Sequence, residues 1–385
     1  MITGIAWDHR RCWGPLDASI EPYARLTGEE VRWDRRSLYS FGEGDLGDYA
    51  AKYDLVIYDH PFVGDVSRNG WLLDLRPRLS AAQIAHFEHD SVGASWKSYF
   101  YDDGLWALPI DSAAQTAAWR QDLLDHVGWS VPQTLDEVRQ LAEAVAPKGL
   151  HVAWPFVPTD LMCTLVTLAA SRGLRPGRDD TRFLDPSQAI DLIGALKALA
   201  AIVHPLSKGW NPIGCLNHMS SENDVVYVPY LFNYVNYSSP GPHRHITFGS
   251  PPEVIKGQGA HTILGGAGIG ISARSANPEA ALAYALWLCA PDYQGGDYVR
   301  FGGQPGSRSA WQSEACNRLT GNFFQNTLHA LDAAYLRPTP PGFVPFFHEA
   351  TLKLAEVVLR DASATEFVTW LNAAYARLLE SRVRP

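Results

Sequence analysis

The sequence predicts an α/β protein with two compact lobes, and three observations support this. Short apolar segments rich in β-branched residues alternate with longer helix-like segments, as in sheets whose strands are joined by helices. The chain has 385 residues, more than one hydrophobic core usually supports. Hydrophobic residues make up 46% and charged residues 19% of the chain, which is typical of globular proteins.

The first part of the chain contains three predicted strands. Residues 2–7 (ITGIAW) form a short apolar run, residues 31–33 (VRW) alternate in polarity, and residues 53–58 (YDLVIY) are apolar and β-branched. A helix over residues 16–26 is predicted between the first two strands. Because strands and helices alternate, we expect these strands to lie in a parallel sheet.

The rest of the chain continues the alternation. Thr134 is predicted as the N-cap of a helix, with Glu137 closing a capping box. That helix start lies within residues 131–138. The further predicted helices are 119–124, 160–172, 186–203 and 277–289, and the further extended segments are 104–112, the strand 225–230 and the glycine-rich segment 262–272.

The charge pattern argues against a nucleic-acid partner. The net charge is −9, and the basic pairs Arg10-Arg11 and Arg35-Arg36 are isolated rather than part of a stripe that could follow phosphates. We interpret them as solvated charges of loops and strand edges.

Simple metal and cofactor motifs are not found. The five cysteines are scattered and never spaced as C-x-x-C, which excludes a dense disulfide framework and a simple zinc motif. The pairs His86/His89 and His243/His245 have no Cys or carboxylate partner at ligand spacing. The run Gly266-x-Gly268-x-Gly270 lacks the spacing of a dinucleotide fingerprint. We therefore expect no metal and no cofactor.

Four stretches, taken in order, resemble the bacterial extracellular solute-binding proteins that serve sugar-type ABC transporters. They are residues 53–59 (YDLVIYD) with 70–75 (GWLLDL), residues 106–109 (WALP) through 119–123 (WRQDL), residues 132–137 (PQTLDE), and residues 266–272 (GAGIGIS) with the helix after them. Leu135 stands where this family usually has Trp. Together the stretches cover most of the chain.

The resemblance implies a periplasmic-binding-protein-like fold of type II, with two α/β lobes joined by hinge crossings. The first lobe is then 1–110 with 262–305, and the second is 111–261 with 306–385. It also implies a monomer that catalyses nothing and captures a small polar, carbohydrate-like ligand between the lobes for a membrane ABC permease. A periplasmic location is expected from the family; no signal peptide precedes residues 2–7, so the location is cytoplasmic if Met1 is the native start.

Position singles out the candidate ligand-binding residues. Ligands bind beyond the carboxyl ends of strands, sugar-like ligands need polar groups and aromatic faces, and glycines let backbone amides approach closely. The alternative for the Asp and His residues is capping of loop backbone, and Trp7 is assigned to the core. The candidates are Asp8, His9, Trp13, Asp59, His60, Asp111, Trp154, Phe156, Tyr230, Asn233, Tyr234, Gly265, Gly266 and Gln304.

Two alternative functions stay open. An enzyme of this fold, thiaminase I, has a cysteine nucleophile after the Leu-Pro of the first crossing, but residues 108–114 (LPIDSAA) contain none. Cys12 is the remaining candidate nucleophile, because His9, Arg10 and Arg11 could lower its pKa. The other alternative is a cytosolic small-molecule sensor or carrier.

Overall fold

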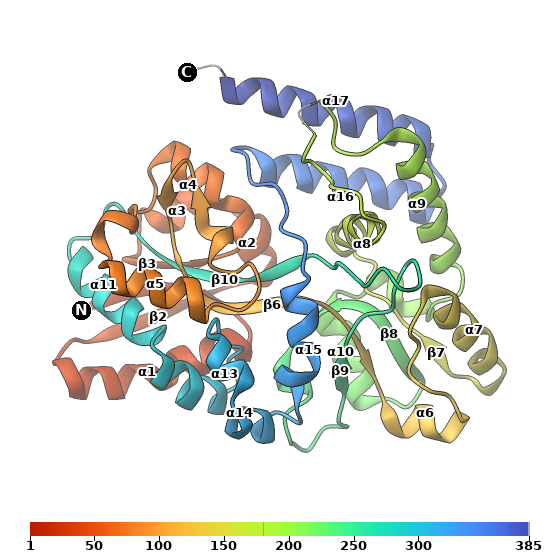
Figure 1. Cartoon of the computed structure of the whole chain (residues 1–385), viewed down its shortest axis with the longest axis horizontal. Helices are drawn as coiled ribbons and strands as arrows, with labels where there is room; N and C mark the ends of the chain where they lie inside the picture. The colour runs from red at the N-terminus through yellow and green to blue at the C-terminus, as the bar shows by residue number, and fades with distance from the viewer. Residues whose placement is uncertain (180, 384–385) are drawn as a thin grey trace.

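A mixed β-sheet runs through the whole molecule (Figure 1). Within residues 1–179 and 181–383, which the computed structural model describes, eight strands form this sheet in the order β2-β1-β3-β10-β6-β8-β7, with β9 also paired to β6. The strands are β1 (Ile2–Trp7), β2 (Val31–Arg36), β3 (Leu55–Tyr58), β6 (Leu108–Trp119), β7 (His151–Val152), β8 (Val225–Phe232), β9 (Thr247–Gly249) and β10 (Leu264–Ile271). A separate pair consists of β4 (Phe100–Tyr101) and β5 (Gly104–Leu105).

Strand β6 belongs to both halves of the molecule. Its first part, up to Ala114, pairs with β10, while its second part, from Gln115, pairs with β8 and β9. In Figure 1, β6 and β10 accordingly lie between β2 and β3 on the left and β7 and β8 on the right; β1 pairs with both β2 and β3. The two halves of one strand therefore connect two separate groups of strands.

The expectation of a parallel sheet is only partly met. Strand β1 pairs in parallel with β2 and β3, but β10 runs antiparallel to both β3 and β6. The sheet is mixed because the chain returns from the other half of the molecule before it forms β10. Strand β10 therefore runs opposite in direction to β1, β2 and β3.

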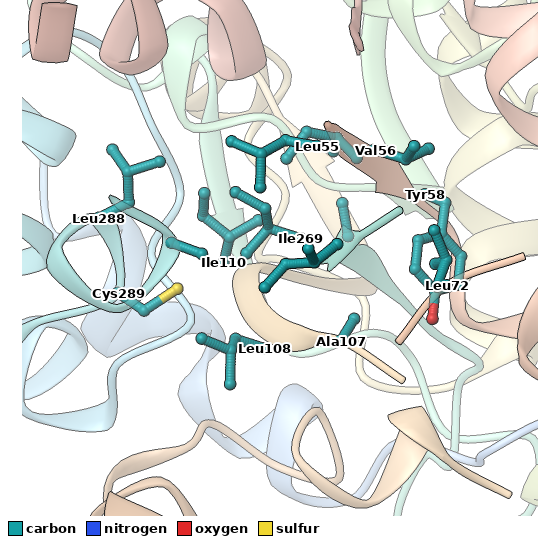
Figure 2. Packing of buried hydrophobic residues seen from close by; sticks show 14 of the residues in the cluster. Leu55, Val56, Tyr58, Leu72, Ala107, Leu108, Ile110, Ile269, Leu288 and Cys289 are labelled. Carbon is teal, nitrogen blue, oxygen red and sulfur yellow. The ribbon is translucent and has the colours of Figure 1, made fainter. Parts of the chain in front are cut away.

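One set of helices packs on the strands β1, β2 and β3. Side chains of β3, β6, β10 and α11, including Leu55, Leu108, Ile269 and Leu288, pack together in its hydrophobic core (Figure 2). The helices of this set are α1 (Arg10–Thr27), α2 (Leu38–Glu43), α3 (Leu46–Ala50), α4 (Val63–Asn69), α5 (Ala81–Asp90), α11 (Pro278–Leu288) and α12 (Pro291–Tyr293).

The other helices form hydrophobic clusters with β8, β9 and with one another. None of the helices in the described part of the chain is long and apolar enough to cross a membrane. They are α6 (Gln121–Val127), α7 (Leu135–Val145), α8 (Pro158–Ser171), α9 (Pro186–Ala200), α10 (Pro212–Ser221), α13 (Arg308–Gln312), α14 (Glu314–Leu319), α15 (Phe323–Asp332), α16 (Phe343–Arg360) and α17 (Ala364–Val383).

Two helix starts differ from their predictions. Helix α1 begins six residues earlier than expected, because the His9 side chain accepts a hydrogen bond from the Arg11 N–H and caps the helix. Thr134 caps α7 as predicted, accepting from the Glu137 N–H at 3.3 Å. The Glu137 carboxylate, however, accepts from the Gln133 N–H rather than from Thr134, so the predicted capping box is incomplete.

Candidate functional site

A cavity of about 260 Å³ lies where the two groups of strands meet. Its walls come from both sides: the end of β1, the start of α1, helix α2 and the end of β3 on one side, and the starts of α8 and α10 and the end of β8 on the other. The lining residues are Trp7, Arg11, Leu38, Tyr39, Phe41, Gly42, Asp59, Ala113, Val157, Thr159, Asp160, Asn211, Pro212, Phe232, Tyr234, Gly265 and Gly266.

Two glycines at the start of β10 form part of the wall. Gly266 has a φ of +106°, and a Cβ added to it would lie 2.4 Å from the Asp111 carbonyl oxygen. A Cβ on Gly265 would lie 2.7 Å from the Phe232 ring. Only glycine fits at Gly266, because its backbone is in the left-handed region and packs closely on β6.

Arg11 forms a buried ion pair with Asp111 beside the cavity. Its Nε donates to Asp111 Oδ2 at 2.8 Å, its Nη2 donates to Asp111 Oδ1, and its Nη1 donates to the Asn233 carbonyl oxygen at 2.9 Å. Burial alone would lower the pKa of Arg11, but the Asp111 carboxylate outweighs burial and raises it. Arg11 is therefore charged, and it connects α1 to β6 and to the end of β8.

An amide network extends from this ion pair. Asn233 Oδ1 accepts from Gln304 Nε2 at 2.9 Å, and the same Nε2 donates to the Ser112 carbonyl oxygen at 2.7 Å. Gln304 Oε1 accepts from the Val235 N–H at 3.2 Å. Within the described residues, the buried Nδ2 of Asn233 has no acceptor. The network joins three segments that are far apart in the sequence, directly behind the cavity.

Asp59 faces the cavity from the end of β3. Its Oδ2 accepts from Arg337 Nη2 at 3.1 Å, and its Oδ1 lies 3.0 Å from His60 Nδ1. Burial raises the pKa of Asp59, but the nearby Arg337 and His60 have a larger combined effect, so the pKa lies below its usual value. Asp59 is consequently an ionised hydrogen-bond acceptor at the cavity wall.

Aromatic rings supply much of the remaining wall. The Trp7 and Phe41 ring centroids are 4.7 Å apart, and Tyr234 lies 4.8 Å from the Arg11 guanidinium and 4.7 Å from the His9 ring. Burial raises the pKa of Tyr234 to about 12, so its hydroxyl stays protonated at neutral pH. Among the described residues, no group accepts the buried Nε1–H of Trp7.

The fourteen sequence-predicted residues fall into three groups. Asp59, Tyr234, Gly265 and Gly266 line the cavity. A second group contacts lining residues from behind: His9, His60, Asp111 and Asn233, with Gln304 bonded to Asn233. The residues of the third group do not line the cavity: Asp8, Trp13, Trp154, Phe156 and Tyr230.

Within this third group, some residues lie near the surface and others in a hydrophobic core. Asp8 is exposed, 3.9 Å from Arg35 Nη1, and Trp13 lies beneath the Arg35 guanidinium at 4.4 Å. Trp154, Phe156 and Tyr230 are fully buried in the cluster around α8.

Sequence reasoning missed several lining residues. Trp7 belongs to the core, as predicted, but it also lines the cavity. The interpretation of Arg11 and Arg36 as solvated charges is wrong, because both are about 95% buried, and Arg11 lines the cavity. Helices α8 and α10 each begin with an X-Pro step, and their first residues line the cavity. Proline at the first helical position marks a helix start, so Val157 and Asn211 could have been found from that signal.

Cys12 is a poor nucleophile in this structure. The thiol is buried, and burial raises its pKa well above the usual value. Arg11 and Arg36 act in the opposite direction, but more weakly. Arg11 thus lowers this pKa, as expected, but desolvation of the thiolate dominates and the net shift is upward.

One protein family is identified by a sequence model that matches most of the chain. The sequence model for "Bacterial extracellular solute-binding protein" matches residues 25–295. A comparison with curated proteins finds no match.

Solved structures resemble the chain over nearly its whole length. MalE3 of T. maritima, solved with maltose, has a TM-score of 0.82 at 17% identity and is covered over 99% of both chains. An ABC transporter solute-binding protein from Agrobacterium radiobacter K84, solved with ribitol, has a TM-score of 0.83 at 17% identity over 98% of both chains. One from Thermotoga lettingae, bound to α-D-tagatose, has a TM-score of 0.81 at 16% identity, covering 98% of this chain and 99% of that one. The chain therefore has the two-lobed fold of these proteins.

Proposed function

The chain belongs to the bacterial extracellular solute-binding protein family, and we propose that its solute is a small, hydroxyl-rich carbohydrate or polyol. The solute would bind in the cavity between the two groups of strands and pass to an ABC transporter. The similar structures that hold maltose, ribitol and tagatose support this ligand class.

The composition of the cavity wall is the observation that carries the proposal. Trp7, Phe41 and Tyr234 offer ring faces for the C–H groups of a sugar, and Asp59 offers a carboxylate oxygen for its hydroxyls. The charges of Arg11 and Asp59 are already balanced by protein partners, so the solute need not supply countercharges for them. A volume of about 260 Å³ is near the small end of ligand pockets, which span about 300–1,000 Å³, and favours a short solute over a long oligosaccharide.

We propose that the lobes are residues 1–110 with 262–305 and residues 111–261 with 306–385, and that they close on the solute about their crossings. Ser112 N–H donates to the Gln304 carbonyl oxygen at 3.2 Å, so two of the crossings lie side by side. The hydrophobic clusters support this division, since almost all members of the core around β1 and β3 come from residues 1–110 and 262–305. Small backbone rotations at such crossings are enough for rigid lobes to move.

The remaining parts of the proposal concern partners and chemistry. We propose a monomer that meets a membrane ABC permease outside the cytoplasm, as the family description "extracellular" supports. We also propose that it leaves the solute chemically unchanged, supported by the buried, unreactive Cys12.

Calorimetric titration tests the ligand class. Purified protein, freed of co-purified solute, is titrated with neutral monosaccharides, disaccharides and polyols, and separately with sugar acids and thiamine-like heterocycles. We expect saturable binding of a neutral solute, with a rise in melting temperature that follows its saturation. Binding of a sugar acid or a heterocycle alone would contradict the proposed solute class.

Two tyrosines form a matched pair for locating the site. Tyr234→Ala, which removes a cavity wall, is expected to weaken binding at least about 10-fold. Tyr237→Ala serves as control, because Tyr237 lies outside the cavity lining and its hydroxyl donates to Asn217. Equal losses in the two variants would place the solute elsewhere. The recovered solute is then examined by mass spectrometry, and a product that disappears in Cys12→Ser would restore the enzyme alternative.

A further inference from the structure

A cluster of histidines and one carboxylate lies outside the cavity, between η5 (Pro205–Gly209), α10 and β8. His204 precedes η5, His218 lies on α10, and Asp224 lies in the turn before β8. Their metal-ligating atoms all lie within 4.8 Å of one another. In the described part of the chain, no other group of three such residues is this close.

Both imidazoles point at the same carboxylate. His204 Nε2 lies 3.1 Å from Asp224 Oδ2, and His218 Nε2 lies 2.7 Å from Asp224 Oδ1. The carboxylate therefore sits between two nitrogen atoms that can bind a metal.

Trp210 holds the rings in these orientations. Its ring stacks on His204 at a centroid distance of 4.9 Å and an interplanar angle of 12°, and lies 4.6 Å from the His218 ring. The side chains of His204, His218 and Asp224 are 8%, 18% and 35% exposed. The nitrogens are thus pre-positioned, while the carboxylate side of the cluster is open to an ion and to water.

We propose that His204, His218 and Asp224 bind a divalent transition metal of the zinc type. Two imidazole nitrogens and one carboxylate oxygen are a typical zinc ligand set, with water as the fourth ligand. With bond lengths near 2.1 Å, a tetrahedral ion keeps its ligand atoms about 3.4 Å apart. To admit it, the His218–Asp224 and His204–Asp224 contacts of 2.7 and 3.1 Å must lengthen toward this spacing. Because all the ligand atoms already lie within 4.8 Å of one another, side-chain rotation can make this adjustment. Hard cations such as Mg²⁺ prefer all-oxygen ligands and are excluded.

Metal binding would break one hydrogen bond of the His204 ring. Its Nδ1 accepts the Leu206 N–H at 3.2 Å and caps η5, so the neutral ring carries its proton on Nε2. Binding through Nε2 moves that proton to Nδ1, and the Leu206 N–H then loses its acceptor. Zinc should therefore leave the Leu206 amide less protected from hydrogen exchange.

Calorimetry of the tag-free full chain, treated with a chelator and then dialysed, tests the site. We expect one equivalent of Zn²⁺ to bind and Mg²⁺ not to bind. His218→Gln and Asp224→Asn should each weaken zinc binding at least about 100-fold, since even loss of outer-shell partners costs 10–100-fold. The double variant His243→Gln/His245→Gln serves as control for unrelated histidines and should bind as the native protein does.

Melting curves recorded without metal keep the result interpretable, because only variants that unfold cooperatively are compared. Native-like zinc affinity in both His218→Gln and Asp224→Asn would overturn the proposal, as would the absence of saturable binding to the native chain. Hydrogen exchange gives an independent test: if zinc binds but the Leu206 amide keeps its protection, His204 is not a ligand.

Discussion

Two tryptophans at the ends of short strands have opposite roles in this structure. Trp7 ends β1, lines the cavity and has no acceptor for its Nε1–H among the described residues. Trp154 follows β7, is fully buried and donates its Nε1–H to Thr164 Oγ1 at 3.2 Å. The Nε1–H of Trp154 therefore has a protein acceptor, whereas the Nε1–H of Trp7 is buried and has none among the described residues. The comparison shows that a position just after or at the end of a strand does not by itself decide whether an aromatic ring reaches the cavity: Trp7 lines it and Trp154 does not.

The largest expected effect comes from removing the core member of the pair. Trp154→Ala should lower the free energy of unfolding by about 3–5 kcal/mol, because it leaves a large cavity among Phe156, Tyr230 and α8. Solute affinity of the molecules that remain folded should not change. Urea unfolding and calorimetry at low temperature measure the two quantities. A loss of affinity without a loss of stability would move Trp154 into the binding site.

The ion pair beside Trp7 tests whether the cavity wall is itself part of the folded core. Asp111→Leu should cost about 3 kcal/mol in urea unfolding, because it leaves the buried Arg11 guanidinium without its carboxylate. The double variant Arg11→Met/Asp111→Leu removes both charges and should recover most of that stability. If the double variant is as unstable as the single one, the pair matters through its shape rather than its charge.

Trp7→Phe should weaken both packing and binding. It breaks no internal hydrogen bond, because Nε1–H has no protein acceptor among the described residues. Trp7 is only 3% exposed and packs on Phe41, so the urea midpoint should fall, but by less than in Trp154→Ala. Solute affinity should fall by about 5-fold, the value of one net hydrogen bond of about 1 kcal/mol. An unchanged affinity, measured by calorimetry, would show that the solute does not use this donor.

The smallest expected effect is a loss of stability at acidic pH through Asp59, the carboxylate in the cavity wall. The pKa of Asp59 is below its usual value in the folded protein. Its contribution to stability is therefore fully present above the unfolded-state pKa of about 3.9 and is lost as the pH falls below this through the folded pKa. Melting curves between pH 7 and pH 3 should show a steeper acid loss for the native protein than for Asp59→Asn. Parallel curves would contradict an ionised, partnered Asp59.

Local patterns were enough to predict much of the fold. The apolar runs that became β1, β3 and β8, the cap at Thr134 and the helix after Asn277 all follow from short-range preferences. The same patterns placed Asp59 and Tyr234 just after strands, and both line the cavity. The location of these two side chains at the cavity was predictable, because the carboxyl ends of strands in such sheets meet at one crevice.

Residues far apart in the sequence required the tertiary structure. Arg11 was interpreted as a solvated charge because its partner Asp111 is 100 residues away. His204, His218 and Asp224 were not considered together because no short motif joins them. In both cases the contact depends on strand order and helix packing, which local periodicity does not encode.

The sequence by itself determined the alternation of strands and helices and the family of the fold, since these depend on side-chain periodicity and on short ordered motifs. Only the tertiary structure decided that β10 returns antiparallel, that Trp7 rather than Trp154 lines the cavity, and that the charged Arg11 is buried in an ion pair with Asp111. The physical reason is that burial and pairing are properties of the assembled chain. Whether a given residue is solvated, packed in a core or in contact with a ligand depends on which other residues the folded chain places around it.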